Sequence, residues 1–102
     1  MIIYSVTISI EAALRANWLG WMEEVHIPDV MATGCFQSYS LQELVEPKPQ
    51  EGAYTFNIQY LCESLEEYER YQKDFAPALQ AEHTKRYKDR AVGFRTLLRR
   101  IT

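Results

Sequence analysis

The sequence predicts an α+β fold, and three observations lead to this prediction. Four segments have the alternating pattern or the β-favouring composition of strands. Two longer segments repeat apolar residues at intervals of three and four, which is typical of helices packed on one face. The order along the chain is strand, helix, strand, strand, helix, strand. This is the split βαβ order of the ferredoxin-like fold, a four-stranded antiparallel sheet with two helices on one face.

The first strand is predicted over residues 2–10, where isoleucine, tyrosine and valine alternate with serine and threonine. The first helix follows over residues 11–26, and its apolar stripe consists of Leu14, Trp18, Trp21, Met22 and Val25. We expect this helix to stop at Ile27, because Pro28 disfavours helical geometry in the residue before it. Residues 28–34 then form a short helical turn that proline opens and glycine closes.

Residues 35–45 predict a second strand, with a bulge or burial on both faces because its apolar residues fall on both parities. Residues 46–52 contain two prolines and a glycine, which indicates a hairpin loop. Residues 53–61 have the clearest alternation in the chain and predict the third strand.

The second helix is predicted to begin at Ser64, because Ser64 and Glu67 have the spacing of a capping box. Its stripe continues to Tyr87, and Pro77 should break or kink it near Phe75. Residues 91–101 form the last predicted strand.

Length, charge and cysteine content narrow the function classes. A chain of 102 residues predicts one domain, spanning residues 1–102. The net charge of −3 disfavours a nucleic-acid partner, and no apolar run reaches the ~18 residues of a membrane span. Without an export signal, the pattern indicates a cytoplasmic protein whose Cys35 and Cys62 are reduced. No motif for a metal or an organic cofactor is present, so we expect none.

The sheet face away from the helices should carry neutral polar residues. Strands one and three place six such residues there: Ser5, Thr7, Ser9, Thr55, Asn57 and Gln59. Small uncharged polar groups suit a surface that is buried yet hydrogen-bonded. This predicts a homodimer in which two sheets face each other and close a barrel. The alternative is a solvated face of modest polarity.

The chain resembles a small bacterial family of about a hundred residues, known as a domain of unknown function, within the dimeric α/β-barrel superfamily. The segments that carry this resemblance are MIIYSVTISI, WLGWM with HIPDV and TGCF, YTFNIQY, and VGFRT. The resemblance implies a ferredoxin-like fold and a dimer, but no activity.

Members of this superfamily include cofactor-free oxygenases, small-molecule isomerases and haem-degrading enzymes. The segment beginning at His26 is similar to the His-x-Pro segment of an oxygenase-associated branch. The haem-degrading branch uses an Asn on strand one, a Trp on strand three and a His on the second helix. This sequence offers Ser5 or Thr7, then Tyr60, and only His83 matches, so the resemblance disfavours haem degradation.

His26 and Arg95 are the candidate catalytic residues. A histidine titrates near neutrality and could act as a base, although His26 could instead cap the end of the first helix. Arg95 is assigned to the neutral polar face, where it would hold an anionic group or form a salt bridge between subunits.

Five further residues are candidates for a ligand-binding wall: Trp18, Trp21, Tyr39, Asn57 and Tyr60. The tryptophans could equally be core residues packed on the sheet. His83 lies on the apolar stripe of the second helix, which favours a hydrogen-bonded core or interface histidine.

Three functions remain open. The first is a homodimer that binds a small, partly apolar molecule between the sheet and the first helix. The second is a cofactor-independent monooxygenase or isomerase with His26 as base and Arg95 holding a substrate oxygen. The third is a structural or regulatory dimer without a ligand.

Overall fold

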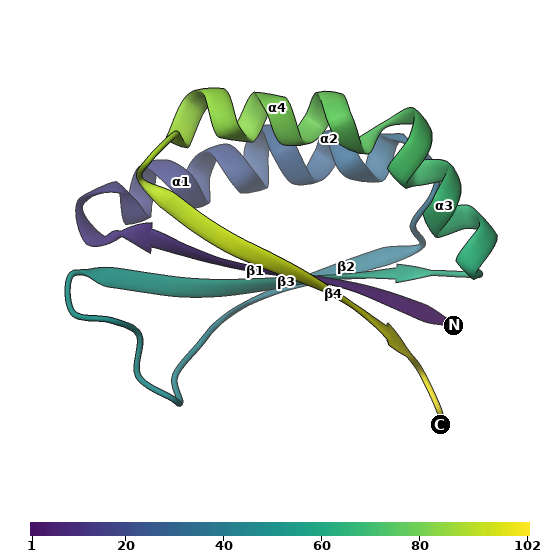
Figure 1. The fold of residues 1–102 in the computed structure, drawn as a ribbon, viewed down its shortest axis with the longest axis horizontal. Coiled ribbons are helices and arrows are strands. Elements are labelled where there is room, and N and C mark those ends of the chain that lie inside the picture. Colours follow the sequence, from purple (N-terminus) through teal and green to yellow (C-terminus); the bar gives the residue numbers. More distant parts are fainter.

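A four-stranded antiparallel sheet carries helices on one face (Figure 1), as seen in a computed structural model that describes residues 1–102. The elements are β1 (Ile2–Glu11), α1 (Arg15–Trp21), α2 (Ile27–Ala32), β2 (Ser38–Glu43), β3 (Ala53–Cys62), α3 (Leu65–Asp74), α4 (Ala76–Tyr87) and β4 (Ala91–Arg99). The strands lie in the order β2-β3-β1-β4. This confirms the predicted ferredoxin-like fold. None of the helices combines the length and apolar character that a membrane span requires.

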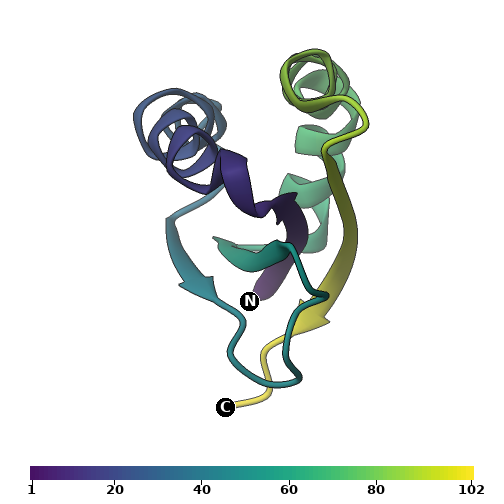
Figure 2. The same cartoon turned by 90° about the vertical axis from the view of Figure 1, so that its left-hand side faces the viewer.

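The helices form two rows that lie side by side above the sheet (Figure 2). The first row contains α1 and α2, and the second contains α3 and α4. The loop between β2 and β3 lies below the sheet, on the side away from the helices.

The register of β1 shows which side chains face the helices. Val6 lies opposite Ile58 of β3 and opposite Arg95 of β4. Directly opposed residues of an antiparallel pair project to the same face, and Val6 and Ile58 are buried on the helix side. The assignment of Arg95 to the neutral polar face was therefore wrong, because this side chain projects toward the helices.

The predicted end of the first helix at Ile27 was also wrong. α1 continues through a π-helical turn, Met22–His26, directly into α2. His26 and Ile27 keep helical φ angles of −68° and −63°. Pro28 is tolerated because it stands in the first turn of α2, after a π-helical turn that changes the hydrogen-bond pattern of the preceding carbonyls.

The second strand is shorter than predicted and has no bulge. β2 pairs regularly with β3 from Ser38 to Glu43. Of the apolar residues that fall on the second parity, Phe36 lies before β2. Leu44 follows β2 on the open face of the sheet, with its backbone N–H still bonded to Thr55 of β3 at 2.8 Å. The last strand likewise ends at Arg99 rather than at residue 101.

The predictions for the second helix are confirmed. The Ser64 side chain accepts a hydrogen bond from the backbone N–H of Glu67 at 3.2 Å. The helix is interrupted at Phe75, and Pro77 stands in the first turn of α4. The interruption lets α4 take a new direction across the sheet.

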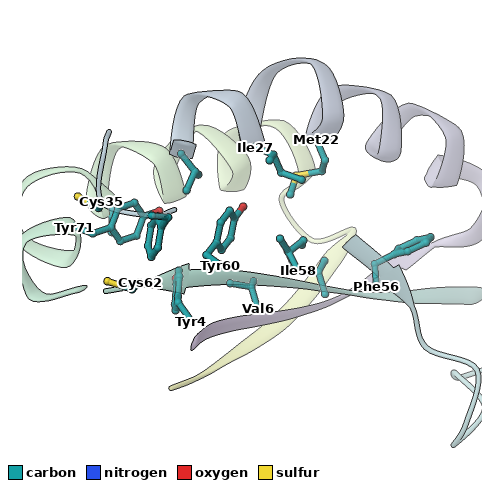
Figure 3. Packing of buried hydrophobic residues seen from close by; sticks show 14 of the residues in the cluster. Tyr4, Val6, Met22, Ile27, Cys35, Phe56, Ile58, Tyr60, Cys62 and Tyr71 are labelled. Atoms are coloured by element: carbon teal, nitrogen blue, oxygen red, sulfur yellow. The ribbon is translucent and has the colours of Figure 1, made fainter. Parts of the chain in front are cut away.

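The core fills the space between the sheet and the two helical rows. Met22 and Ile27 point down from the helix toward Ile58 and Tyr60 of β3 (Figure 3). At one end the rings of Tyr4, Phe36 and Tyr71 pack together, with ring centroids 4.8 to 5.9 Å apart. At the other end Trp18 stacks on Phe56 at 5.2 Å.

The open face of the sheet carries the predicted neutral polar residues, and they bind one another. The Asn57 amide nitrogen donates to the hydroxyls of Ser5 and Thr7 at 2.9 and 3.0 Å, and Gln42 donates to the Asn57 oxygen at 2.7 Å. Ser5 is only 6% exposed in the single chain. The hydrogen-bonding part of the prediction is therefore satisfied within one chain.

Candidate functional site

A cavity of about 30 Å³ lies under the helices, against the centre of the sheet. Its walls come from β1, β3 and β4, from the helical segment Met22 to Val30, and from α3 and α4. Twelve residues line it: Tyr4, Val6, Ile8, Met22, His26, Val30, Ile58, Tyr60, Tyr71, Gln80, His83 and Arg95. A volume of this size holds one or two water molecules.

A larger groove of about 140 Å³ adjoins the cavity along β4. The two spaces share four lining residues: Val6, Ile8, His83 and Arg95. A cavity of roughly 150 Å³ accepts a benzene molecule. The groove therefore has room for a single ring, and the side chains of His83 and Arg95 border both spaces.

His83 is held as a neutral imidazole. The indole nitrogen Nε1 of Trp18 donates a hydrogen bond to Nε2 of His83 at 3.0 Å. An imidazole nitrogen can accept only when it is unprotonated, so the remaining proton of the neutral ring is on Nδ1. Burial lowers the pKa of His83, and the nearby positive charge of Arg95 lowers it further.

His26 lies inside a continuous helix, so it does not cap a helix end. Its ring stacks on Trp21 with centroids 5.2 Å apart and meets the His83 ring at 5.9 Å. Burial, then His83 and Arg95, lower the pKa of His26 to about 4. At neutral pH the ring is therefore uncharged. The π-helical turn that contains His26 is a feature often found at functional sites.

Arg95 is the only permanently charged side chain that lines either space. No carboxylate lies among the lining residues, and Arg95 forms no salt bridge within the chain. Burial raises the pKa of the Tyr4 hydroxyl, and the adjacent Arg95 acts in the opposite direction. The arrangement is an unpaired cation beside neutral imidazoles and phenols, which favours an anionic or strongly hydrogen-bond-accepting group.

The structure brings together only some of the candidates from the sequence. His26, Arg95 and Tyr60 line the cavity. Trp18 and Trp21 stand behind it, where they contact the two histidine rings. The other two candidates lie elsewhere: Tyr39 is 48% exposed on the edge strand β2, and Asn57 belongs to the hydrogen-bond network on the opposite face of the sheet.

Sequence reasoning missed Tyr4, Tyr71 and Gln80 as lining residues. The signal for Gln80 is its spacing from Ala76, His83 and Tyr87, at intervals of four, three and four along α4. A polar side chain within such a stripe faces the sheet rather than the solvent. No group of three or more His, Cys, Asp or Glu side chains converges here or elsewhere in the chain.

Mild acid should destabilise the fold through His26. Its folded pKa of about 4 lies below the ordinary value of 6.5. Below pH 6.5 the unfolded state therefore binds more protons than the folded state does. The free energy of unfolding falls as the pH drops from about 6.5 through the folded pKa. We expect a loss of ~1–2 kcal/mol between pH 7 and pH 5, measured by urea unfolding at each pH.

His26→Gln serves as the control for this pH dependence. It should reduce the loss of stability over the same range, leaving the part due to His83. An unchanged slope in the variant would show that His26 does not titrate with a lowered pKa.

Solved structures with the same fold include three of particular interest. HapK from Hahella chejuensis has a TM-score of 0.71 and 7% identity, covering 99% of this chain and 93% of that one. An ethyl tert-butyl ether d (EthD) family protein from Bacillus halodurans has a TM-score of 0.70 and 10% identity, over 99% and 100%. SnoaB, a cofactor-independent oxygenase from Streptomyces nogalater, was solved as a mutant and has a TM-score of 0.63 and 9% identity, over 99% and 94%. Likeness at these identities shows the fold alone.

Among curated proteins, none matches this chain in sequence. One family model does match, over residues 1–101, and its description is a domain of unknown function, DUF4286. This confirms the resemblance to a family of that kind. Because the match spans nearly every residue, the chain belongs to the DUF4286 family.

Proposed function

We propose that the protein binds a small, partly apolar molecule with an anionic group, in the cavity and groove beneath its helices. The observation that carries this proposal is Arg95, an unpaired cation that lines a space without a carboxylate. A guanidinium offers several N–H donors and a permanent charge, which suit a carboxylate or another oxyanion. Arg95 is exposed to solvent on the edge strand β4 of the single chain, so a dissolved anion can reach it.

Each part of the site has a role in this proposal. Arg95 pairs with the anionic group of the ligand, and the ring of the ligand occupies the groove along β4. His26 and His83 border the site as neutral imidazoles, so they add no charge that would compete for the anion. Trp18 keeps the His83 ring in place through its hydrogen bond.

Benzoate is a suitable probe because it combines one ring with one carboxylate. We expect it to bind with a dissociation constant on the order of 1 mM, measured by NMR titration of the backbone amides around the cavity. Benzyl alcohol, which has a similar ring without the charge, should bind at least about tenfold more weakly. Arg95→Gln should remove this preference.

His26→Gln is the matched control variant, because it alters a different residue of the same cavity. It should leave benzoate binding within about twofold of the wild type, since a neutral amide replaces a neutral ring. Equal binding of benzoate and benzyl alcohol to the wild-type protein would contradict the proposal.

We also propose that two copies associate through the open face of the sheet. The apolar side chains of β4 support this, since Val92 is 73% and Phe94 62% exposed on that face. They border a hollow of about 740 Å³ that extends to Leu44 and Pro47 of the β2–β3 loop. Exposed apolar groups around a hollow are typical of a protein interface.

Phe94→Glu should convert such a dimer into a monomer, because a carboxylate would be buried without a partner at the interface. The molar mass in solution, measured by light scattering after gel filtration, should fall by half. Val25→Glu, on the exposed side of the helical layer, is the control and should leave the mass unchanged. A wild-type protein that is already monomeric would exclude this association.

A second candidate function is a cofactor-independent monooxygenase or isomerase with His26 as base. The unprotonated state of His26 near Arg95 favours it, since a base must be free of its proton and the resulting oxyanion needs a positive partner. A base with a pKa of about 4 removes protons poorly at neutral pH, however. For this reason binding is the better-supported function.

Proton abstraction can be tested with phenylpyruvate, an anionic ring compound with an acidic C–H next to a carbonyl. If His26 is a base, the protein should accelerate exchange of that hydrogen in D2O by about a hundredfold over buffer, as followed by NMR. His26→Gln should abolish the acceleration while phenylpyruvate still binds. Equal exchange rates with the two proteins would leave binding as the function.

The third hypothesis, a dimer without a ligand, requires a completely filled core. The cavity and its adjoining groove argue against it.

A further inference from the structure

A separate cavity of about 350 Å³, wide open to solvent, lies where α4 ends and the chain turns toward β4. Four of its seven lining residues are cations: Lys85, Arg86, Lys88 and Arg90. No carboxylate lines it, although the chain as a whole has 14 acidic and 11 basic residues. It shares no residue with the cavity beneath the helices, so it does not depend on the proposed function.

Hydrogen bonds at this cavity hold two of its polar groups in place. The Tyr87 hydroxyl donates to the side-chain oxygen of Asn17 at 2.8 Å and accepts from Nε of Arg86 at 3.2 Å. The Arg86 guanidinium also lies over the Trp21 ring, at 5.4 Å from its centroid. These contacts leave the amide nitrogen of Asn17 and the terminal nitrogens of Arg86 free to donate.

The helix dipole explains only two of the four cations that line this cavity. Lys85 and Arg86 stand in the last turn of α4, where cations interact favourably with the exposed carbonyls. Lys88 and Arg90 lie beyond the helix, and a turn at Asp89 with a φ of 64° separates them. Both nevertheless line the same cavity. Lys85 and Lys88 form no salt bridge, whereas Nε of Arg90 lies 3.4 Å from a carboxylate oxygen of Glu11.

We infer that this cavity binds the phosphate group of a soluble small molecule. Its lysine, arginine and asparagine nitrogens are donors, and a phosphate offers several acceptor oxygens with more than one negative charge. The cavity is also large enough for a group of that size. The net charge of −3 disfavours adhesion of the whole chain to an anionic membrane, so a free phosphate compound is the better fit.

Inorganic pyrophosphate is the probe for this site. Titration should shift the backbone amide signals of residues 85–90 in the NMR spectrum of the full chain. Lys85→Gln combined with Lys88→Gln should weaken binding about tenfold. The control, Lys48→Gln combined with Lys73→Gln, removes the same charge from exposed positions elsewhere and should change binding by less than about twofold.

A second arm of the experiment distinguishes the source of the phosphate. Vesicles of phosphatidylglycerol and of phosphatidylcholine are compared in a sedimentation assay. Pyrophosphate binding without vesicle binding supports the inference. Co-sedimentation with phosphatidylglycerol would overturn it, and so would an equal loss of pyrophosphate binding in both double variants. The absence of amide shifts would also overturn it, and would show that the cations only compensate the end of α4.

Discussion

The antiparallel register of β1 with its two neighbours determines which side chains face the helices. A slip of one residue would exchange the two faces of a strand. With the observed register, β4 directs Arg95 toward the helical layer and leaves Phe94 on the open face. The unpaired cation of the cavity and the apolar surface below the sheet are therefore two consequences of one pairing.

The hydrogen bond from Trp18 to His83 connects the two helical rows above that sheet. It requires an unprotonated Nε2 on His83, and the buried surroundings favour the same state. The neighbouring His26 is likewise uncharged at neutral pH. Arg95 therefore remains the one charge in the site, and the electrostatic character of the cavity follows from the packing of the helices.

Local signals in the sequence were sufficient for most of the fold. The alternation of β1 and β3, the Ser64 cap and the break near Pro77 depend on neighbouring residues, and all were predicted correctly. The face of Arg95 was not, because β4 has apolar residues on both parities and only its pairing with β1 decides between them. The continuous helix through Pro28 depends on a π-helical turn that no residue pattern indicated. Asn57 was grouped with the site although strand geometry places it on the opposite face.

Charge, rather than the burial of a large apolar surface, should dominate recognition in the cavity beneath the helices. A volume of about 30 Å³ holds little more than water, so an apolar ligand gains little free energy there. A charge-assisted hydrogen bond to Arg95 is about twice as strong as a neutral one. The groove along β4 can then select the ring that accompanies the charge. Under the proposed function, this division of roles accounts for an arginine without a partner at a site with so little space.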